Sequence, residues 1–344
     1  KTIAVYKSLT PDMNANSIGG TVNMELREAP EDLHYELMYQ QGYTAKSKTL
    51  SNYRAIASAS SRFFDNKLGI YGLVNAESYD RNSDNMSASY NLAGEEVEID
   101  PTTGFRPVKV SSVTFGRHLE TRERYGGNLI LDYNLPNGSL KFVNMLARIK
   151  SDYTDHNQTI DYDAGRMNWQ LREGENFTDQ QMHSLKLDYD LGFLSADISA
   201  SYTSSKNKLD KSPQVNFNQV DALQAGVPRD NMVPEDLLFL LTQFKGYDNV
   251  ILRSADLFSN NYKEDKYTYK ADFEIPFNLG SDLGGFIKLG GQMYNQKNST
   301  DQETPYLGFN GSATGTGDDI QSKLMRGVKD KFGITVDAQG NLTG

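Results

Sequence analysis

The residues that most often bind metals or act in catalysis are few and scattered in this sequence. Cysteine is absent, which removes thiolate nucleophiles and the common zinc sites built on sulfur. The four histidines have no partner at metal-ligand spacing: His34, His118, His156 and His183. No phosphate-binding glycine loop, nucleophile elbow or Ser/His/Asp order stands out. We therefore expect that the protein is not an enzyme, has no metal site and binds no cofactor.

One acidic run has some of the residues that bind calcium. The segment from Asp161 to Gly165 begins like a calcium-binding loop, with carboxylates at alternate positions. It lacks the later acidic ligand at the spacing that such a loop requires. A polar hairpin tip is the interpretation we favour here.

Six aromatic side chains in polar segments could bind a ligand, because an aromatic ring can stack on the flat face of a ligand. They are Tyr90, Phe105, Phe115, Trp169, Phe217 and Tyr247. The alternative for each of them is packing inside a loop, shielded from solvent. We keep all six as candidate ligand contacts.

The composition of the 344 residues is polar overall but rich in strand-forming residues. The hydrophobic fraction is 38% and the mean hydropathy is -0.60, yet 11% of the residues are aromatic, nearly all Tyr and Phe. A net charge of -10 leaves no basic face for phosphates, so we expect no nucleic-acid partner. No stretch approaches the roughly 18 apolar residues of a membrane-spanning helix, so any membrane crossing must use strands.

From Tyr35 onward, short segments of alternating apolar and polar residues recur, as a period of two requires in strands. The clearest places Tyr267, Tyr269 and Ala271 on one face and the polar residues between them on the other. About nine strands are predicted in this way: 35–43, 52–63, 68–80, 124–134, 140–152, 183–191, 196–203, 267–275 and 286–294.

The connections between these strands alternate between short and long. Short turns are predicted near Asn66, Asn137, Gly192 and Ser281. Long loops are predicted at about 81–121, 153–181, 206–262 and 298–344. Within the loops we expect a small hairpin starting near Val97, an extra strand near 159–172, and a helix that begins at Pro234 and continues through 237–244.

Strict alternation of short and long connections is typical of outer-membrane barrels, which have short periplasmic turns and long extracellular loops. A soluble β-sandwich also has alternating strands, but it has no reason to keep that order. The polar face of the strand around Lys270 would line a wet lumen in a barrel and would meet solvent in a sandwich. Tyrosines near strand ends fit an interfacial girdle: Tyr35, Tyr43, Tyr133, Tyr189, Tyr202 and Tyr294.

Residues 1–30 do not share the strand pattern. A short apolar strand around Ile3 and Val5 is followed by a Pro11-Asp12 turn and then by a compact string. The string is Ile18-Gly19-Gly20-Thr21-Val22-Asn23, in which the glycines permit close backbone approach. This order resembles the end of the plug domain of TonB-dependent outer-membrane receptors, with Ile18, Gly19, Gly20, Val22 and Asn23 as the structural motif.

The resemblance covers less than a tenth of the chain, and it implies an all-β fold. Residues 1–30 would end a plug, and 31–344 would be the first part of a transmembrane antiparallel barrel, which in this family has about twenty-two strands. Both ends would then be cut from a longer protein.

The implied function is active import of a scarce nutrient, either a siderophore, an oligosaccharide or a vitamin, across the outer membrane of a Gram-negative bacterium. Its partners would be outer-membrane lipid, TonB through a box upstream of Lys1, and in some relatives a surface lipoprotein. The alternative is a soluble or surface-anchored β-rich glycan-binding module.

Overall fold

A computed structural model describes residues 2–6, 21–25, 29–92, 99, 101–102, 104–247, 250–279 and 283–308. Most of these residues are strand, so the all-β prediction is confirmed. Five elements of the sequence prediction lie outside the described residues, at least in large part. They are the Pro11-Asp12 turn, the motif residues Ile18, Gly19 and Gly20, the small hairpin after Val97, the turn at Ser281, and the loop 298–344.

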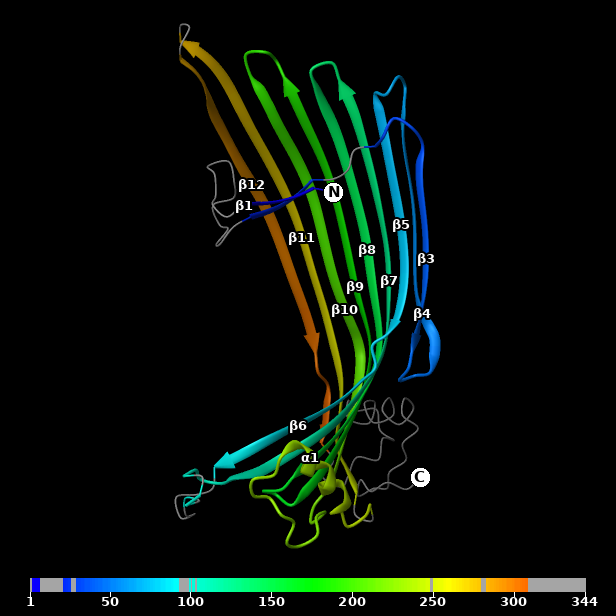
Figure 1. Cartoon of the computed structure of the whole chain (residues 1–344), viewed down its shortest axis with the longest axis vertical. Coiled ribbons are helices and arrows are strands. Elements are labelled where there is room, and N and C mark those ends of the chain that lie inside the picture. Colours follow the sequence, from blue (N-terminus) through cyan, green and yellow to red (C-terminus); the bar gives the residue numbers. More distant parts are fainter. Residues whose placement is uncertain are drawn as a thin grey trace.

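Two sheets are present (Figure 1). The small one pairs β1 (Thr2–Tyr6) with β2 (Thr21–Glu25), so the predicted strand at Ile3 and Val5 meets the strand that carries Val22 and Asn23. The large sheet is antiparallel with eleven strands, nine of them on one path in the order β12-β11-β10-β9-β8-β7-β5-β4-β3. The nine predicted strands correspond to this path.

The strands on the path have these bounds: β3 His34–Thr44, β4 Thr49–Phe63, β5 Leu68–Asp80, β7 Val108–Leu135, β8 Gly138–Asp161, β9 Arg166–Asp190, β10 Ser195–Gln219, β11 Ile251–Leu279 and β12 Leu283–Glu303. Off the path, β6 (Ser83–Leu92) pairs with β7, and β13 (Tyr306–Gly308) pairs with β11.

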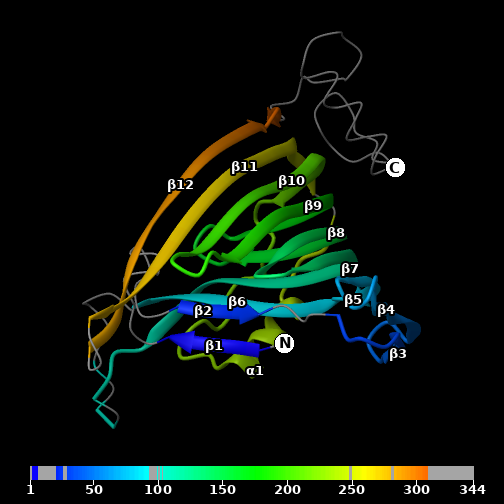
Figure 2. The same ribbon diagram turned by 90° about the horizontal axis from the view of Figure 1, so that it is seen from above.

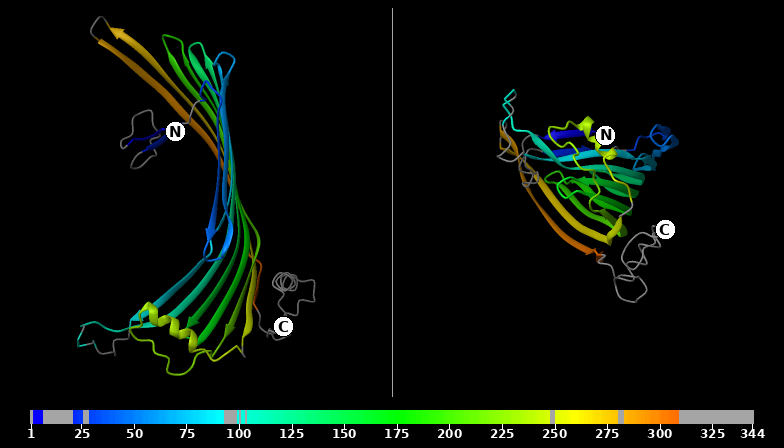
Figure 3. Two further views of the ribbon diagram at one scale, coloured as in Figure 1. Left: turned by 45° about the vertical axis from the view of Figure 1, so that its right-hand side comes forward. Right: turned by 90° about the horizontal axis from the view of Figure 1, so that it is seen from below.

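Short turns join the strands at one end of the large sheet, after Phe63, Leu135 and Asp190, as predicted. We call the opposite end, which carries the β8–β9 tip, the distal end. There the sheet bends toward the side on which the β1–β2 hairpin lies, and this side is concave (Figures 2 and 3). The hairpin therefore faces the concave side of the sheet.

Two of the four long loops predicted from the sequence are largely extended strand. Strands β6 and β7 occupy most of 81–121, and β8 and β9 meet at the turn 162–165 within the predicted loop 153–181. The residues predicted as an extra strand near 159–172 are strand apart from that turn, but they belong to the ends of β8 and β9 and do not form a separate strand. Alternation was not recognised along the distal part of β8 because both of its faces are polar between Lys150 and Thr159.

The side chains divide cleanly between the two faces of the sheet, because cross-strand partners point to the same side. Near the short turns the convex face is apolar: the register aligns Leu131 with Phe142 and Leu185, and these with Ala200 and Tyr269. The next residue along each strand points to the concave face, which carries charge. On β9 this residue is Lys186, which lies 2.8 Å from Asp197 and 3.0 Å from Asp188. Of the girdle tyrosines, Tyr294 lies on the concave face, opposite Thr268.

Residues 220–247, which we call the cap, fold against the convex face at the distal end. The buried core there joins Val113, Ile160 and Met167 of the sheet to Ala222 and Leu237 of the cap. The predicted helix begins at Pro234 as expected but is short: α1 (Pro234–Leu237) continues only as a 3-10 helix, η1 (Leu238–Thr242). The central part of the predicted loop 206–262 is thus a packed lid over β7, β8 and β9.

A buried ion pair ties three strands to the segment that precedes the sheet. Arg62 on β4 pairs with Asp132 on β7, and both side chains are less than a tenth exposed. Between them β5 presents Gly69, whose missing side chain leaves the two groups free to meet. The same guanidinium donates to the carbonyl oxygens of Ala29, at 2.9 Å, and Asn66, at 3.1 Å.

We expect Gly69→Ala to weaken the sheet, because a Cβ at this position overlaps the Asp132 carboxylate. Crowding of this kind costs about 1–3 kcal/mol of unfolding free energy. Gly72→Ala on the same strand is the matched control, since a Cβ there meets nothing within 4 Å. Urea unfolding of both variants measures the difference, and equal stability would contradict the role given to Gly69.

Candidate functional site on the concave face

Neutral polar side chains cross the concave face at the distal end in one row. The register aligns Asn157, Gln170, Asn216 and Ser254 on four successive strands. Each amide donates to the next residue: Asn157 to Gln170 at 3.1 Å, Gln170 to Asn216 at 3.3 Å, and Asn216 to Ser254 at 3.0 Å. A side-chain amide has two donors and two acceptor lone pairs, so each retains hydrogen-bonding capacity toward the concave side.

A second polar row lies two residues further toward the distal tip. Thr114 and Thr159 share a hydrogen bond of 2.8 Å, and Asn218 donates to Asn168 at 2.7 Å. On β7 the first row is occupied by Gly116, which aligns with Asn157 and leaves room for the side chain of Asn85 on β6. Together the amide rows form a neutral surface that can donate to and accept from a ligand with many hydroxyl or amide groups.

A charged cluster borders the amide rows on the side toward the short turns. The ring of His118 lies between two carboxylates, with Nδ1 2.5 Å from Asp155 and Nε2 3.3 Å from Glu120. Glu120 also accepts two hydrogen bonds from Arg122, at 2.9 and 3.0 Å. Arg172 lies over the ring of Tyr153. The cluster is thus internally neutralised and leaves the surface with little net charge.

The protonation states of this cluster follow from its contacts. Burial lowers the pKa of the His118 imidazole, but the hydrogen bonds to Asp155 and Glu120 outweigh burial and raise that pKa above its usual value. Burial also opposes ionisation of Glu120, yet hydrogen bonds from Ser151, His118 and Arg122 hold the pKa of this carboxyl below its usual range. The two carboxylates beside His118 therefore favour the protonated form of its imidazole.

His118 should make the distal sheet more stable at mildly acidic pH. Because its pKa is raised on folding, the stabilisation is complete below about pH 6.5 and fades as pH rises through the folded-state pKa. The expected result is a melting-temperature gap between wild type and His118→Gln that narrows between pH 6 and 9. His156→Gln, at an exposed position on the other face, is the control. A gap that does not change with pH would contradict the assignment.

The aromatic candidates from the sequence lie on the opposite, convex face. Phe115, Trp169 and Phe217 occupy one row of the register, beneath the cap. Trp169 contacts Phe244 and Tyr247 of the cap, with ring centroids 5.9 and 5.8 Å apart. Phe115 and Trp169 pack against the buried distal core, while Tyr247 is mostly exposed.

The two remaining aromatic candidates, Tyr90 and Phe105, are also exposed and lie near the tip of β6 and β7. The hydroxyl of Tyr90 is 3.5 Å from the Met232 carbonyl oxygen of the cap, and Phe105 is 76% exposed. The structure thus brings Phe115, Trp169, Phe217 and Tyr247 together and leaves Phe105 apart from them. None of these contacts reaches the amide rows, which face the other way.

Sequence inspection missed the amide rows because the distal parts of β8, β9 and β10 were predicted as long connections, with a separate strand near 159–172, so their side chains were not placed in register. A signal was present: Asn157 and Thr159, Asn168 and Gln170, and Asn216 and Asn218 are spaced two apart, as side chains on one face of a strand are. The acidic run at Asp161 is a hairpin turn as favoured, with the Ala164 amide donating to the Asp161 carboxylate at 3.0 Å.

Across the described ranges, no three His, Asp or Glu side chains lie close enough together to hold a metal ion. In the same part of the chain, no helix has the length and apolarity that crossing a bilayer requires.

Comparison with known proteins adds little. No protein-family model matches the chain, and no curated protein matches it. Among solved structures, the crystal structure of the siderophore receptor PiuA from Acinetobacter baumannii is similar at 12% identity and a TM-score of 0.26, covering 83% of this chain and 49% of that chain. This chain therefore spans about half the length of that receptor. Likeness at this level carries no argument, so we derive function from the two faces of the sheet.

Proposed function

We propose that this chain is part of a TonB-dependent transporter that imports a scarce nutrient across the outer membrane of a Gram-negative bacterium. The observation that carries the proposal is the large apolar area exposed on the convex face. Its exposed members include Tyr35, Leu37, Val74, Leu129, Leu140, Leu146, Leu185, Ile198, Tyr267, Tyr269, Leu289 and Met293. A water-soluble protein rarely exposes a continuous apolar surface of this extent.

The length and edges of the sheet support the same proposal. A membrane strand needs about 9–11 residues, and the apolar band occupies a similar number next to the short turns. Strands β7 to β11 have 24 to 29 residues, so they continue well beyond such a band. In the described part of the chain, β3 pairs only with β4 and β12 only with β11 along their lengths. Further strands closing a barrel would cover both of these open edges.

The concave side supplies the features of an import path. Its charged and amide side chains suit a water-filled lumen, and the β1–β2 hairpin faces that lumen where the end of a plug would lie (Figure 3). The amide rows favour a cargo rich in neutral hydrogen-bonding groups, and a siderophore, an oligosaccharide or a vitamin each meets this requirement. TonB would act through the plug, and a surface lipoprotein would sit beyond the distal end.

A soluble glycan-binding module is the competing function. The amide rows and the exposed ring of Tyr247 would serve sugar binding equally well. Such a module would, however, have to keep the apolar convex face in contact with water or cover it with another protein. Solubility without detergent therefore separates the two functions.

A matched pair of substitutions on β10 tests the membrane-facing assignment. Ala200 lies between Leu185 and Tyr269 on the convex face, and Ser201 lies between Ser184 and Thr268 on the concave face. We expect Ala200→Arg to destabilise the membrane-inserted protein by about 2–4 kcal/mol and Ser201→Arg to be tolerated. The readout is folding into lipid vesicles, followed by the shift in gel mobility on heating. Equal effects of the two substitutions would reject the assignment.

Uptake by cells tests the transport function itself. A strain lacking the full-length gene should lose growth on one nutrient from a panel of ferric siderophores, oligosaccharides and vitamins. Loss of TonB or of the proton-motive force should abolish uptake of the same nutrient. Gln170→Leu should weaken its binding, because the row then loses an amide between Asn157 and Asn216. Two results together would support the glycan-binding module instead. The deletion strain would grow normally on every nutrient, and the protein would be soluble and bind an oligosaccharide without TonB.

A further inference from the structure

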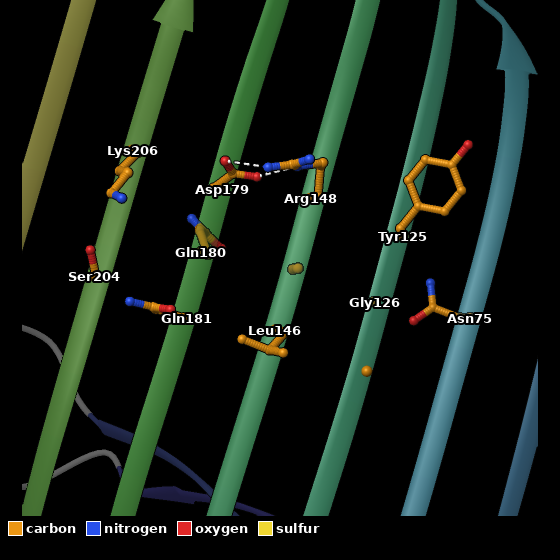
Figure 4. A pocket seen from close by; sticks show the side chains of 12 residues that line it. Asn75, Tyr125, Gly126, Leu146, Arg148, Asp179, Gln180, Gln181, Ser204 and Lys206 are labelled. Carbon is orange, nitrogen blue, oxygen red and sulfur yellow. Dashed lines mark hydrogen bonds and ion pairs between the residues drawn. The ribbon is translucent and has the colours of Figure 1, made fainter.

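A hollow of about 560 Å³ lies on the convex face of the sheet (Figure 4). Its floor exists because β7 carries two consecutive glycines, Gly126 and Gly127, beside Leu146 of β8. Its polar rim includes Tyr125, Arg148, Asp179 and Lys206, and Gln181 and Ser204 line it in the same row as Leu146. Arg148 forms a two-pronged pair with Asp179 at 2.6 and 2.9 Å, which fixes the guanidinium at the rim.

The hollow lies where the apolar band of the convex face ends. Leu146 and Val74, half or more exposed, are in register with Gly127 on its apolar side. Arg148 and Lys206 lie two residues further along their strands, toward the distal end. The apolar part of an amphiphilic ligand would therefore contact the floor, and its charged part would contact the rim on the distal side.

Charge changes in a definite order along the convex face from this point. The first row beyond the band holds three cations and one carboxylate: Arg148, Lys206 and Lys263 with Asp179. Lys263 also pairs with Asp265, at 2.6 Å. The second row balances Lys150 and Lys208 against Glu123 and Asp301. The next row is acidic and contains Asp152, Glu175 and Asp210; Asp152 and Asp210 each pair with the lysine two residues before them. The sequence of surfaces is thus apolar, then basic, then acidic.

We propose that this hollow binds a membrane lipid whose headgroup carries a phosphate next to its acyl chains. The acyl chain lies over Gly127 and Leu146, and the phosphate meets Arg148 and Lys206 at the rim. The acidic row then faces the outer, cationic part of the headgroup region, either an amine or bound divalent cations. Charge complementarity in this order selects a phosphorylated lipid over an uncharged one. The inference rests on the proposed membrane location, because it needs the convex face to meet lipid.

Native mass spectrometry of the full-length protein in detergent tests the proposal. The probes are lipid A, phosphatidylglycerol and an uncharged diacylglycerol, with inorganic phosphate as a competitor. Two variants alter the two halves of the hollow: Lys206→Gln removes charge from the rim, and Gly127→Leu fills the floor, where a Cβ makes only ordinary contacts. Lys67→Gln, an exposed lysine at the short-turn end, is the charge-matched control.

We expect the phosphorylated lipids to remain bound to wild type and to Lys67→Gln. Lys206→Gln should weaken binding about fivefold, as expected for one cation at a membrane surface. Gly127→Leu should weaken lipid binding while leaving inorganic phosphate unaffected. Equal retention of the uncharged lipid, or no effect of either variant, would overturn the proposal. Full competition by inorganic phosphate, with no effect of Gly127→Leu, would also overturn it, because the hollow would then be an anion site.

The heat-dependent gel shift of each variant keeps this inference separate from the proposed function. A variant that shows the shift but does not bind lipid tells against the lipid site alone. If wild type stays soluble without detergent and shows no shift, the membrane location itself has failed.

Discussion

The unbroken antiparallel register of β7, β8 and β9 is the constraint on which the rest of the structure depends. Each pairing continues from the short turns to the distal tip without a shift. Because side chains alternate strictly along a paired strand, one choice of face near the short turns fixes every face in the distal extension. The apolar band, the cap core and the amide rows are therefore consequences of a single alignment.

That alignment gives the same face two different environments. Next to the short turns, the convex face exposes its apolar residues, whereas at the distal end it buries Val113, Ile160 and Met167 under the cap. Between these two regions it carries the basic and acidic rows. Burial beneath the cap is what allows apolar residues to continue on this face beyond the proposed membrane, where they would otherwise meet water.

Sequence periodicity identified the strands best where one face is apolar and the other polar, as around Tyr267 and Tyr269 on β11. It failed where both faces are polar, as along the end of β8 that holds Asn157, because the contrast between faces then disappears. The turns near Asn66 and Asn137 were predictable from local chemistry. The pairing of Arg62 with Asp132 was not, since it joins positions far apart in sequence across a glycine on the intervening strand. The aromatic candidates were visible in the sequence, but the face they share depends on the register and on the cap.

One irregularity has consequences for how this sequence can vary. On β10, Leu209 pairs with Asn176 and Gln214 pairs with Arg172, so β10 contains one residue more than its neighbour in this interval. That extra residue returns Asn216 and Asn218 to the concave face and Val215 to the convex one. Deletion of a single residue between Leu209 and Gln214 would reverse the faces of the residues that follow. Asn216 and Asn218 would then lie under the cap, and Val215 would point into the lumen. Only insertions or deletions of an even number of residues preserve the two faces here. Length variation in related sequences should therefore occur in steps of two residues at this site, whereas at the hairpin tips any length is compatible with the fold.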